Sequence, residues 1–182
     1  EGATGERALA AGVNARATDV AATAVGFDSQ ASGSNSIALG TSSRATQEYS
    51  TALGYSATAT GPSGVAIGFS AQAEGAGNIA IDHGAASNST AQNAVAIGVF
   101  SVANGERAAA LGEAARAEGE DAIAIGTGAK AVGERSISIG TGNVVNGDRS
   151  GAIGDPSIID GDDSYSVGNN NVIAADASDV FV

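Results

Sequence analysis

The strongest constraint on the fold of this chain is an internal period of 14 residues. A glycine returns at this spacing along the chain, with one aspartate in its place and one longer interval of 16 residues before Gly98. We call the residues that mark the period the anchor residues: Gly12, Gly26, Gly40, Gly54, Gly68, Asp82, Gly98, Gly112, Gly126, Gly140, Gly154 and Gly168. A fixed period is typical of a solenoid, in which each repeat forms one coil that packs on its neighbours.

The residues before each anchor alternate between two kinds. The positions one and three residues before it are mostly Val, Leu or Ile, and we call them the aliphatic rows. The position between them is Ala in ten repeats and Ser138 or Ser166 in the other two. This period-two pattern predicts a β-strand with one large apolar face and one very small face.

A second strand is predicted after each anchor. Small residues such as Ala115 and Ala117 stand three and five residues after it, and between them lie polar residues such as Arg116, expected to face solvent. Another glycine follows seven residues after the anchor in eight of the twelve repeats. We therefore predict coils of two strands of about five residues and two tight turns, with glycine where positive φ or close backbone approach is required. The period-two pattern and the 27 glycines disfavour a helical solenoid.

Two packings of these coils are possible. Either the Ala and Ser rows face inward and the aliphatic rows outward, or the reverse. We favour the first, because the second does not explain why an exposed position is so uniformly small. An aliphatic stripe left in water would then require covering by other copies of the chain, packed parallel and in register. We predict that the interface consists of Val25, Ile37, Leu39, Leu53, Val65, Ile67, Ile79, Ile81, Val95, Ile97, Leu111, Ile123, Ile125, Ile137, Ile139, Ile153 and Val167. The period does not determine the number of chains.

Composition narrows the classes of partner and the sources of stability. The net charge of −12 disfavours binding to nucleic acid or directly to anionic lipid. The chain has no cysteine, so disulfides cannot stabilise it and oligomerisation is the expected substitute. It has neither a long apolar run nor a signal-peptide pattern, and we expect a mature chain or a piece of a longer protein.

No catalytic, cofactor or metal site is predicted. The segment from Gly126 to Lys130 has the wrong spacing for a phosphate loop. His83 is the only histidine, so one chain cannot assemble a histidine-based triad or zinc cluster, and a turn position is expected for it. The acidic residues after Gly154 lack the regular calcium-roll pattern. A left-handed β-helix acyltransferase has a hexapeptide period that does not fit, and we expect a protein that is not an enzyme.

The repeat changes character from about Gly140. The small inward rows enlarge to residues such as Val145 and Ile159, and Pro156 and a cluster of aspartates enter. We place a domain boundary near Ser150, with one domain over residues 1–150 and a second over residues 151–182. Two departures interrupt the first domain. Asp82 replaces an anchor glycine, and two extra residues within 88–92 predict a bulge or protruding loop, an even insertion that preserves strand parity.

The segment from Asn93 to Gly105, which reads NAVAIGVFSVANG, resembles the head repeat of YadA-like trimeric autotransporter adhesins, over about residues 7–150. The C-terminal segment resembles the neck of the same family through Asp155, Pro156, Gly161, Tyr165, Gly168, Asn169, Asn171 and Phe181. The two signatures are independent of each other.

The resemblance implies an all-β fold, a left-handed parallel β-roll that assembles as a parallel homotrimer. It implies a neck whose chains cross to their neighbours before a coiled-coil stalk, with Asn169 and Asn171 expected to satisfy buried backbone groups there. It also implies a bacterial cell-surface location, with an outer-membrane anchor outside this chain, and binding to host cells or to matrix proteins such as collagen, fibronectin or laminin. Phe69, Phe100, Val102 and Val132 are candidate contact residues. The alternative is a structural spacer that binds no receptor.

Overall fold

The computed structural model describes residues 2–88 and 91–182, and within these ranges it consists of short parallel β-strands joined by turns, without a helix. The chain forms two compact units, Glu1–Asn93 and Ala94–Val182, and each contains six coils of the repeat. The predicted all-β solenoid with coils of 14 residues is confirmed. Among the described residues, no helix is long and apolar enough to cross a membrane.

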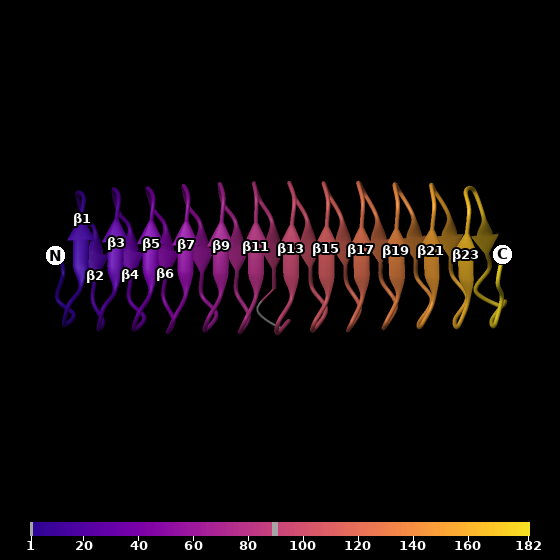
Figure 1. Cartoon of the computed structure of the whole chain (residues 1–182), viewed down its shortest axis with the longest axis horizontal. Coiled ribbons are helices and arrows are strands. Elements are labelled where there is room, and N and C mark those ends of the chain that lie inside the picture. The colour runs from indigo at the N-terminus through magenta and orange to yellow at the C-terminus, as the bar shows by residue number, and fades with distance from the viewer. Residues whose placement is uncertain (1, 89–90) are drawn as a thin grey trace. The chain divides into compact units, whose positions relative to one another are not determined.

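In the first unit, each coil contributes one strand to each of two parallel sheets (Figure 1). The odd-numbered strands are β1 Leu9–Ala11, β3 Thr23–Val25, β5 Ile37–Leu39, β7 Thr51–Leu53, β9 Val65–Ile67 and β11 Ile79–Ile81. The even-numbered strands are β2 Arg16–Ala17, β4 Gln30–Ala31, β6 Arg44–Ala45, β8 Thr58–Ala59, β10 Gln72–Ala73 and β12 Ala86–Ser87. Strands pair with a shift of one repeat, as in Leu53 beside Ile67, so each row of the sequence becomes a row on the surface.

The second unit repeats this arrangement. Its odd-numbered strands are β13 Val95–Ile97, β15 Ala109–Leu111, β17 Ile123–Ile125, β19 Ile137–Ile139, β21 Gly151–Ile153 and β23 Tyr165–Val167. Its even-numbered strands are β14 Val102–Ala103, β16 Arg116–Ala117, β18 Lys130–Ala131, β20 Val144–Val145, β22 Ile158–Ile159 and β24 Val172–Ile173. The same register places Ile125 beside Ile139.

The strands are shorter than the sequence predicted. They contain three residues in the odd set and two in the even set, whereas about five were expected. The reason is a residue in the left-handed region with φ near +55°, which recurs roughly every seven residues along most of the chain. Many of these residues are not glycine, and they include Tyr49, Phe100 and Arg107. Each of them ends the extended backbone, so only the segment between two turns remains in a ladder.

The two glycine positions of the repeat meet different requirements. The anchor Gly54 has a φ of +133°, which side chains rarely adopt. Gly133, at the other turn, does not have positive φ, but a Cβ there would lie 2.1 Å from the carbonyl oxygen of Gly147 in the next coil. Asp82, at an anchor position, takes a φ of +103°, and its carboxylate accepts a hydrogen bond from the N–H of His83 at 2.8 Å. An aspartate that bonds to its own turn is among the residues that tolerate such backbone.

The interior of both units is built from very small side chains. The Ala rows of both strand sets are buried except for the half-buried Ala10 in the first coil, and most of the serines and asparagines that directly precede the strands are buried too. Ser29 and Ser43 each donate a hydroxyl hydrogen bond to the carbonyl of the preceding anchor glycine, at 3.0 and 2.9 Å. The predicted packing, with small rows inward and aliphatic rows outward, is confirmed.

The interior of the last coils is larger, as expected from the sequence. Val145, Ala152, Ile159 and Ile173 form a buried apolar cluster. The domain boundary near Ser150 stays a prediction. The two compact units divide after Asn93.

The predicted loop within 88–92 contains Ser89 and Thr90, which lie outside the described residues. On its two sides, Asn88 accepts a hydrogen bond at its carbonyl from the side-chain amide of Asn78 at 2.9 Å, and Ala91 is buried. Strand parity is preserved beyond the insertion, because Ala94 and Ala96 again face inward.

Candidate functional site

The outward side chains of the odd-numbered strands form an apolar surface on each unit, which we call the aliphatic face. All the residues predicted for the trimer interface lie on it, and in a single chain each of them is exposed or half-buried. Leu53, for example, is 43% exposed and Ile153 is 49% exposed. Water contact with so many branched aliphatic side chains is unfavourable, so this face is suited to covering by another chain.

The outward side chains of the even-numbered strands form a different surface, which is largely polar. In the first unit this row contains Arg16, Gln30, Arg44, Thr58, Gln72 and Ala86, and none of them is acidic. Of the residues predicted to face solvent in this row, Arg16, Arg44, Gln72 and Arg116 are exposed, and Gln30 and Lys130 are half-buried.

A pocket of about 530 Å³ lies over β2, β4 and β6 on this polar face. Arg16, Gln30 and Arg44 stand side by side on successive strands and line it. The turns that precede these strands complete the wall with Asn14, Asp28 and Ser42. Asn14 donates its side-chain amide to Asp28 Oδ1 at 2.8 Å, which joins two of the turns. We call this site the arginine pocket, and the sequence reasoning did not predict it.

In the last coils the even-numbered outward row becomes apolar, which the sequence analysis also missed. Val144, Ile158 and Val172 take the places that Lys130 and Arg116 occupy in the coils before. Ile158 is 44% exposed and Val172 is 70% exposed. These apolar residues stand four positions after their anchors, so they could have been seen in the sequence. They indicate that both outward faces of the last coils are suited to covering by another chain.

In the first unit, aromatic rings occupy the turn after the anchor residue in three successive coils, and we call this stack of rings the aromatic turn. The rings of Tyr55 and Phe69 stack with centroids 5.1 Å apart, and the His83 ring meets Phe69 edge to face at 4.8 Å. His83 occupies a turn, as expected from the sequence. Phe69 and Phe100, two of the candidate contact residues, are exposed, whereas Val102 and Val132 are half-buried.

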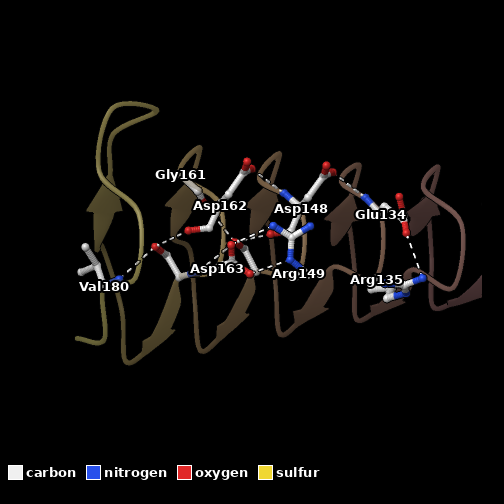
Figure 2. Close-up of polar contacts among 10 residues, drawn as sticks. Glu134, Arg135, Asp148, Arg149, Gly161, Asp162, Asp163 and Val180 are labelled. Atoms are coloured by element: carbon white, nitrogen blue, oxygen red, sulfur yellow. Dashed lines mark hydrogen bonds and ion pairs between the residues drawn. The ribbon is translucent and has the colours of Figure 1, made fainter.

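In the second unit, the turns that precede the odd-numbered strands carry a ladder of acidic and basic side chains. Figure 2 shows the backbone N–H of Glu134 donating to Asp148 Oδ1 and the N–H of Asp148 donating to Asp162 Oδ1, both at 2.8 Å. Arg149 binds Asp163 through two hydrogen bonds, Nε to Oδ1 at 2.6 Å and Nη2 to Oδ2 at 2.7 Å. Each contact joins residues one repeat apart, so the ladder fastens each turn to the next. No group of three or more His, Cys, Asp or Glu side chains within residues 2–88 and 91–182 is arranged to hold a metal ion.

The ion pairs in these turns shift the ionisation of their carboxylates. The hydrogen bonds from Arg149 lower the pKa of Asp163, because they favour its charged form. Arg107 lowers the pKa of Asp121 in the same way, through Nε to Oδ1 at 2.6 Å.

We expect Arg149→Gln to raise the pKa of Asp163 toward the ordinary aspartate value. Because the folded-state pKa lies below the unfolded value, the pair contributes stability above the unfolded pKa and loses it as pH falls through the folded pKa. The stability difference between the native protein and the variant should therefore be present at neutral pH and vanish in acid. Titration of the Asp163 carboxyl carbon by NMR measures the shift. Arg135→Gln is the control, since Arg135 pairs with Glu134, and it should leave Asp163 unchanged.

The residues predicted for the neck lie in the last two coils and the segment after them. Tyr165 pairs with Phe181 in an isolated parallel bridge, and their exposed fractions are 40% and 77%. Gly161 lies at a turn (Figure 2). Its carbonyl accepts a hydrogen bond from the hydroxyl of Ser150 at 2.8 Å. Gly168 is an anchor with a φ of +136°.

The asparagines of this segment bond within their own chain. Asn169 Oδ1 accepts the backbone N–H of Asp155 at 2.8 Å, so it does satisfy a backbone group, although that group is exposed. Asn171 instead donates its side-chain amide to the Ser166 hydroxyl at 2.7 Å. The backbone carbonyl of Pro156 accepts the N–H of Asn170 at 2.6 Å. The role of these residues in chain crossing stays a prediction.

The repeat matches a known family along most of its length. The YadA head domain repeat (2 copies) matches residues 3–29, 31–57, 59–81, 84–101, 89–112, 103–129, 117–143 and 131–155. The chain belongs to the YadA head family. The resemblance seen in the sequence is thus confirmed for the head, while residues 156–182 lie outside the match. No curated protein matches the chain.

Membership in the YadA head family makes the chain an adhesin-type surface module of an autotransporter. In such a head, the coils provide a repeated scaffold, and the outward rows and turns provide the surfaces for contact. The aliphatic face, the aromatic turn and the arginine pocket are therefore the candidate binding surfaces of this YadA head.

Proposed function

We propose that this YadA head is the binding module of a bacterial surface adhesin, and that it attaches to host cells or to matrix proteins such as collagen, fibronectin or laminin without catalysing a reaction. The observation that carries the proposal is the family match over residues 3–155. Extended outward faces also favour contact with large partners over the capture of a small substrate.

We further propose that the working form is a parallel homotrimer at the outer-membrane surface, held there by an anchor outside this chain. The aliphatic face supports this, since burial of each Val, Leu or Ile side chain contributes about 1.5–3 kcal/mol. Covering Val144, Ile158 and Val172 as well requires a neighbouring chain to reach the other sheet in the last coils. A neck whose chains cross over would provide that cover.

Binding of the purified protein to immobilised collagen, fibronectin and laminin and to intact epithelial cells tests the adhesin function. We expect saturable binding to at least one of these surfaces, above the level measured on albumin. If the folded protein binds none of them, the structural spacer replaces the adhesin as the better assignment.

A further inference from the structure

The arginine pocket combines two cationic side chains with a polar hollow. Its lining contains two guanidinium groups and one carboxylate, a net charge of +1 within a chain of net charge −12. Among the residues that the structure describes, Arg44 has no ion-pair partner. An exposed guanidinium beside a hollow is well suited to bind an anion through two parallel hydrogen bonds.

The order of side chains in the pocket separates the two cations. Gln30 stands between Arg16 and Arg44 in the paired register, so the arginines lie two strands apart. Strands in a sheet are spaced by about 4.8 Å, which puts the two backbone positions roughly 10 Å from each other. The pocket can therefore hold two anionic groups at separate points of one extended ligand.

The rest of the lining favours a sugar chain as that ligand. Asn14, Gln30 and Ser42 offer amide and hydroxyl groups, and Asp28 offers an acceptor, which are the partners that sugar hydroxyls need. No aliphatic or aromatic side chain lines the pocket, so it lacks the apolar anchors typical of peptide or drug-like ligands. The volume of about 530 Å³ lies within the usual range for ligand sites.

We propose that the arginine pocket binds an anionic glycan, with Arg16 and Arg44 holding its sulfate or carboxylate groups and the turn residues contacting its hydroxyls. This proposal adds a class of ligand to the proposed adhesin function. It rests on that function in one respect, because it takes the ligand to be displayed on a host surface.

The second unit offers a matched comparison. Arg116 and Lys130 stand on neighbouring strands of the same outward row, so that unit also brings two cations together. In that unit Arg116 pairs with Glu118 at 2.9 Å. The turns before its two strands carry Ala114 and Gly128, at the places where the arginine pocket has polar side chains. If binding depends on the whole pocket, loss of Arg16 and Arg44 should weaken it more than loss of Arg116 and Lys130. If binding depends on charge attraction alone, the two losses should have equal effects.

Calorimetric titration of the purified protein with a heparin hexasaccharide at low salt tests the proposal. We expect binding that weakens with added salt and that falls by about tenfold or more in the double variant Arg16→Gln with Arg44→Gln. The double variant Arg116→Gln with Lys130→Gln removes the same charge and should bind within about twofold of the native protein. Equal losses in both variants, or no binding to the native protein, would overturn the proposal.

Titration with two further ligands identifies which chemical groups of a glycan the pocket recognises. A hyaluronan hexasaccharide carries carboxylates without sulfates, so its binding would show that carboxylates suffice, and binding of heparin alone would show that sulfate is required. An uncharged dextran of equal length should not bind, and dextran binding as tight as heparin binding would contradict the role of the arginines. The arginine side-chain NMR signals of the native protein should shift on addition of heparin for Arg16 and Arg44, which places the ligand independently of affinity.

The same variants separate this site from the adhesin function as a whole. Attachment to collagen, fibronectin, laminin and epithelial cells is measured in parallel with both double variants. If heparin does not bind but attachment persists in the Arg16→Gln with Arg44→Gln variant, the glycan site fails while the adhesin function stands.

Discussion

The double variant Ile125→Asp with Ile139→Asp is expected to dissociate the proposed trimer. The two residues are neighbours on β17 and β19 and belong to the aliphatic face. In a trimer with this face at its axis, the variant would bring six carboxylates together in an apolar interface. Burying an ionised group without a partner is costly, and about 1.5–3 kcal/mol of apolar burial would also be lost per side chain. Sedimentation velocity at micromolar concentration measures the outcome.

A matched control separates assembly from the general cost of placing aspartate in a strand. Thr58→Asp with Gln72→Asp adds the same charge to two neighbouring strands, but on the polar face. This variant should sediment as the native protein does. A trimer that survives both aspartates on the aliphatic face would refute the proposed interface, whatever the effect on thermal stability.

Substitution of Ala110 by isoleucine is expected to destabilise the coils from within. Ala110 is completely buried, and in the paired strands its neighbours are Ala96 and Ala124. Three extra carbons at this point must push apart two sheets that approach closely through methyl groups. Overpacking of this kind costs about 1–3 kcal/mol per chain, which corresponds to a fall of roughly 2–12 °C in the unfolding midpoint. Circular dichroism during heating measures it.

The adjacent residue offers the control. Ala109 lies on the same strand but points outward, between Val95 and Ile123 in the aliphatic rows. Isoleucine at this position continues a row that already contains isoleucine, so Ala109→Ile should leave the midpoint within a few degrees of the native value. Equal destabilisation by both substitutions would contradict the inward packing of the Ala rows.

The sequence predicted the solenoid and the facing of its rows, because both depend on a period that repeats twelve times. A strand with Ala110 on one side and Leu111 on the other has only one sensible orientation when its neighbours alternate in the same way. The change in packing after Gly140 was visible for the same reason, as Val145 and Ile159 stand where alanine is usual.

Strand length and the arginine pocket could not be predicted in this way. The left-handed residues that end the strands include Tyr49 and Arg107, which have no side-chain feature that indicates such a backbone. The pocket requires the register that sets Arg16, Gln30 and Arg44 in one row and the turns that raise Asn14 beside them. The number of chains and the crossing of the neck depend on contacts between molecules, about which a period within one chain says nothing.

Among the described residues of each unit, the main contacts between strands lie within a coil or with the coils immediately before and after it. Loss or duplication of one 14-residue stretch at a turn leaves every surviving coil with a neighbour of the same kind, so coil number can drift during evolution without redesign of the interior. Such recombination would change how many copies of each outward row the module carries, while each local surface keeps its chemistry. The number of coils and the chemistry of their surfaces can therefore change separately.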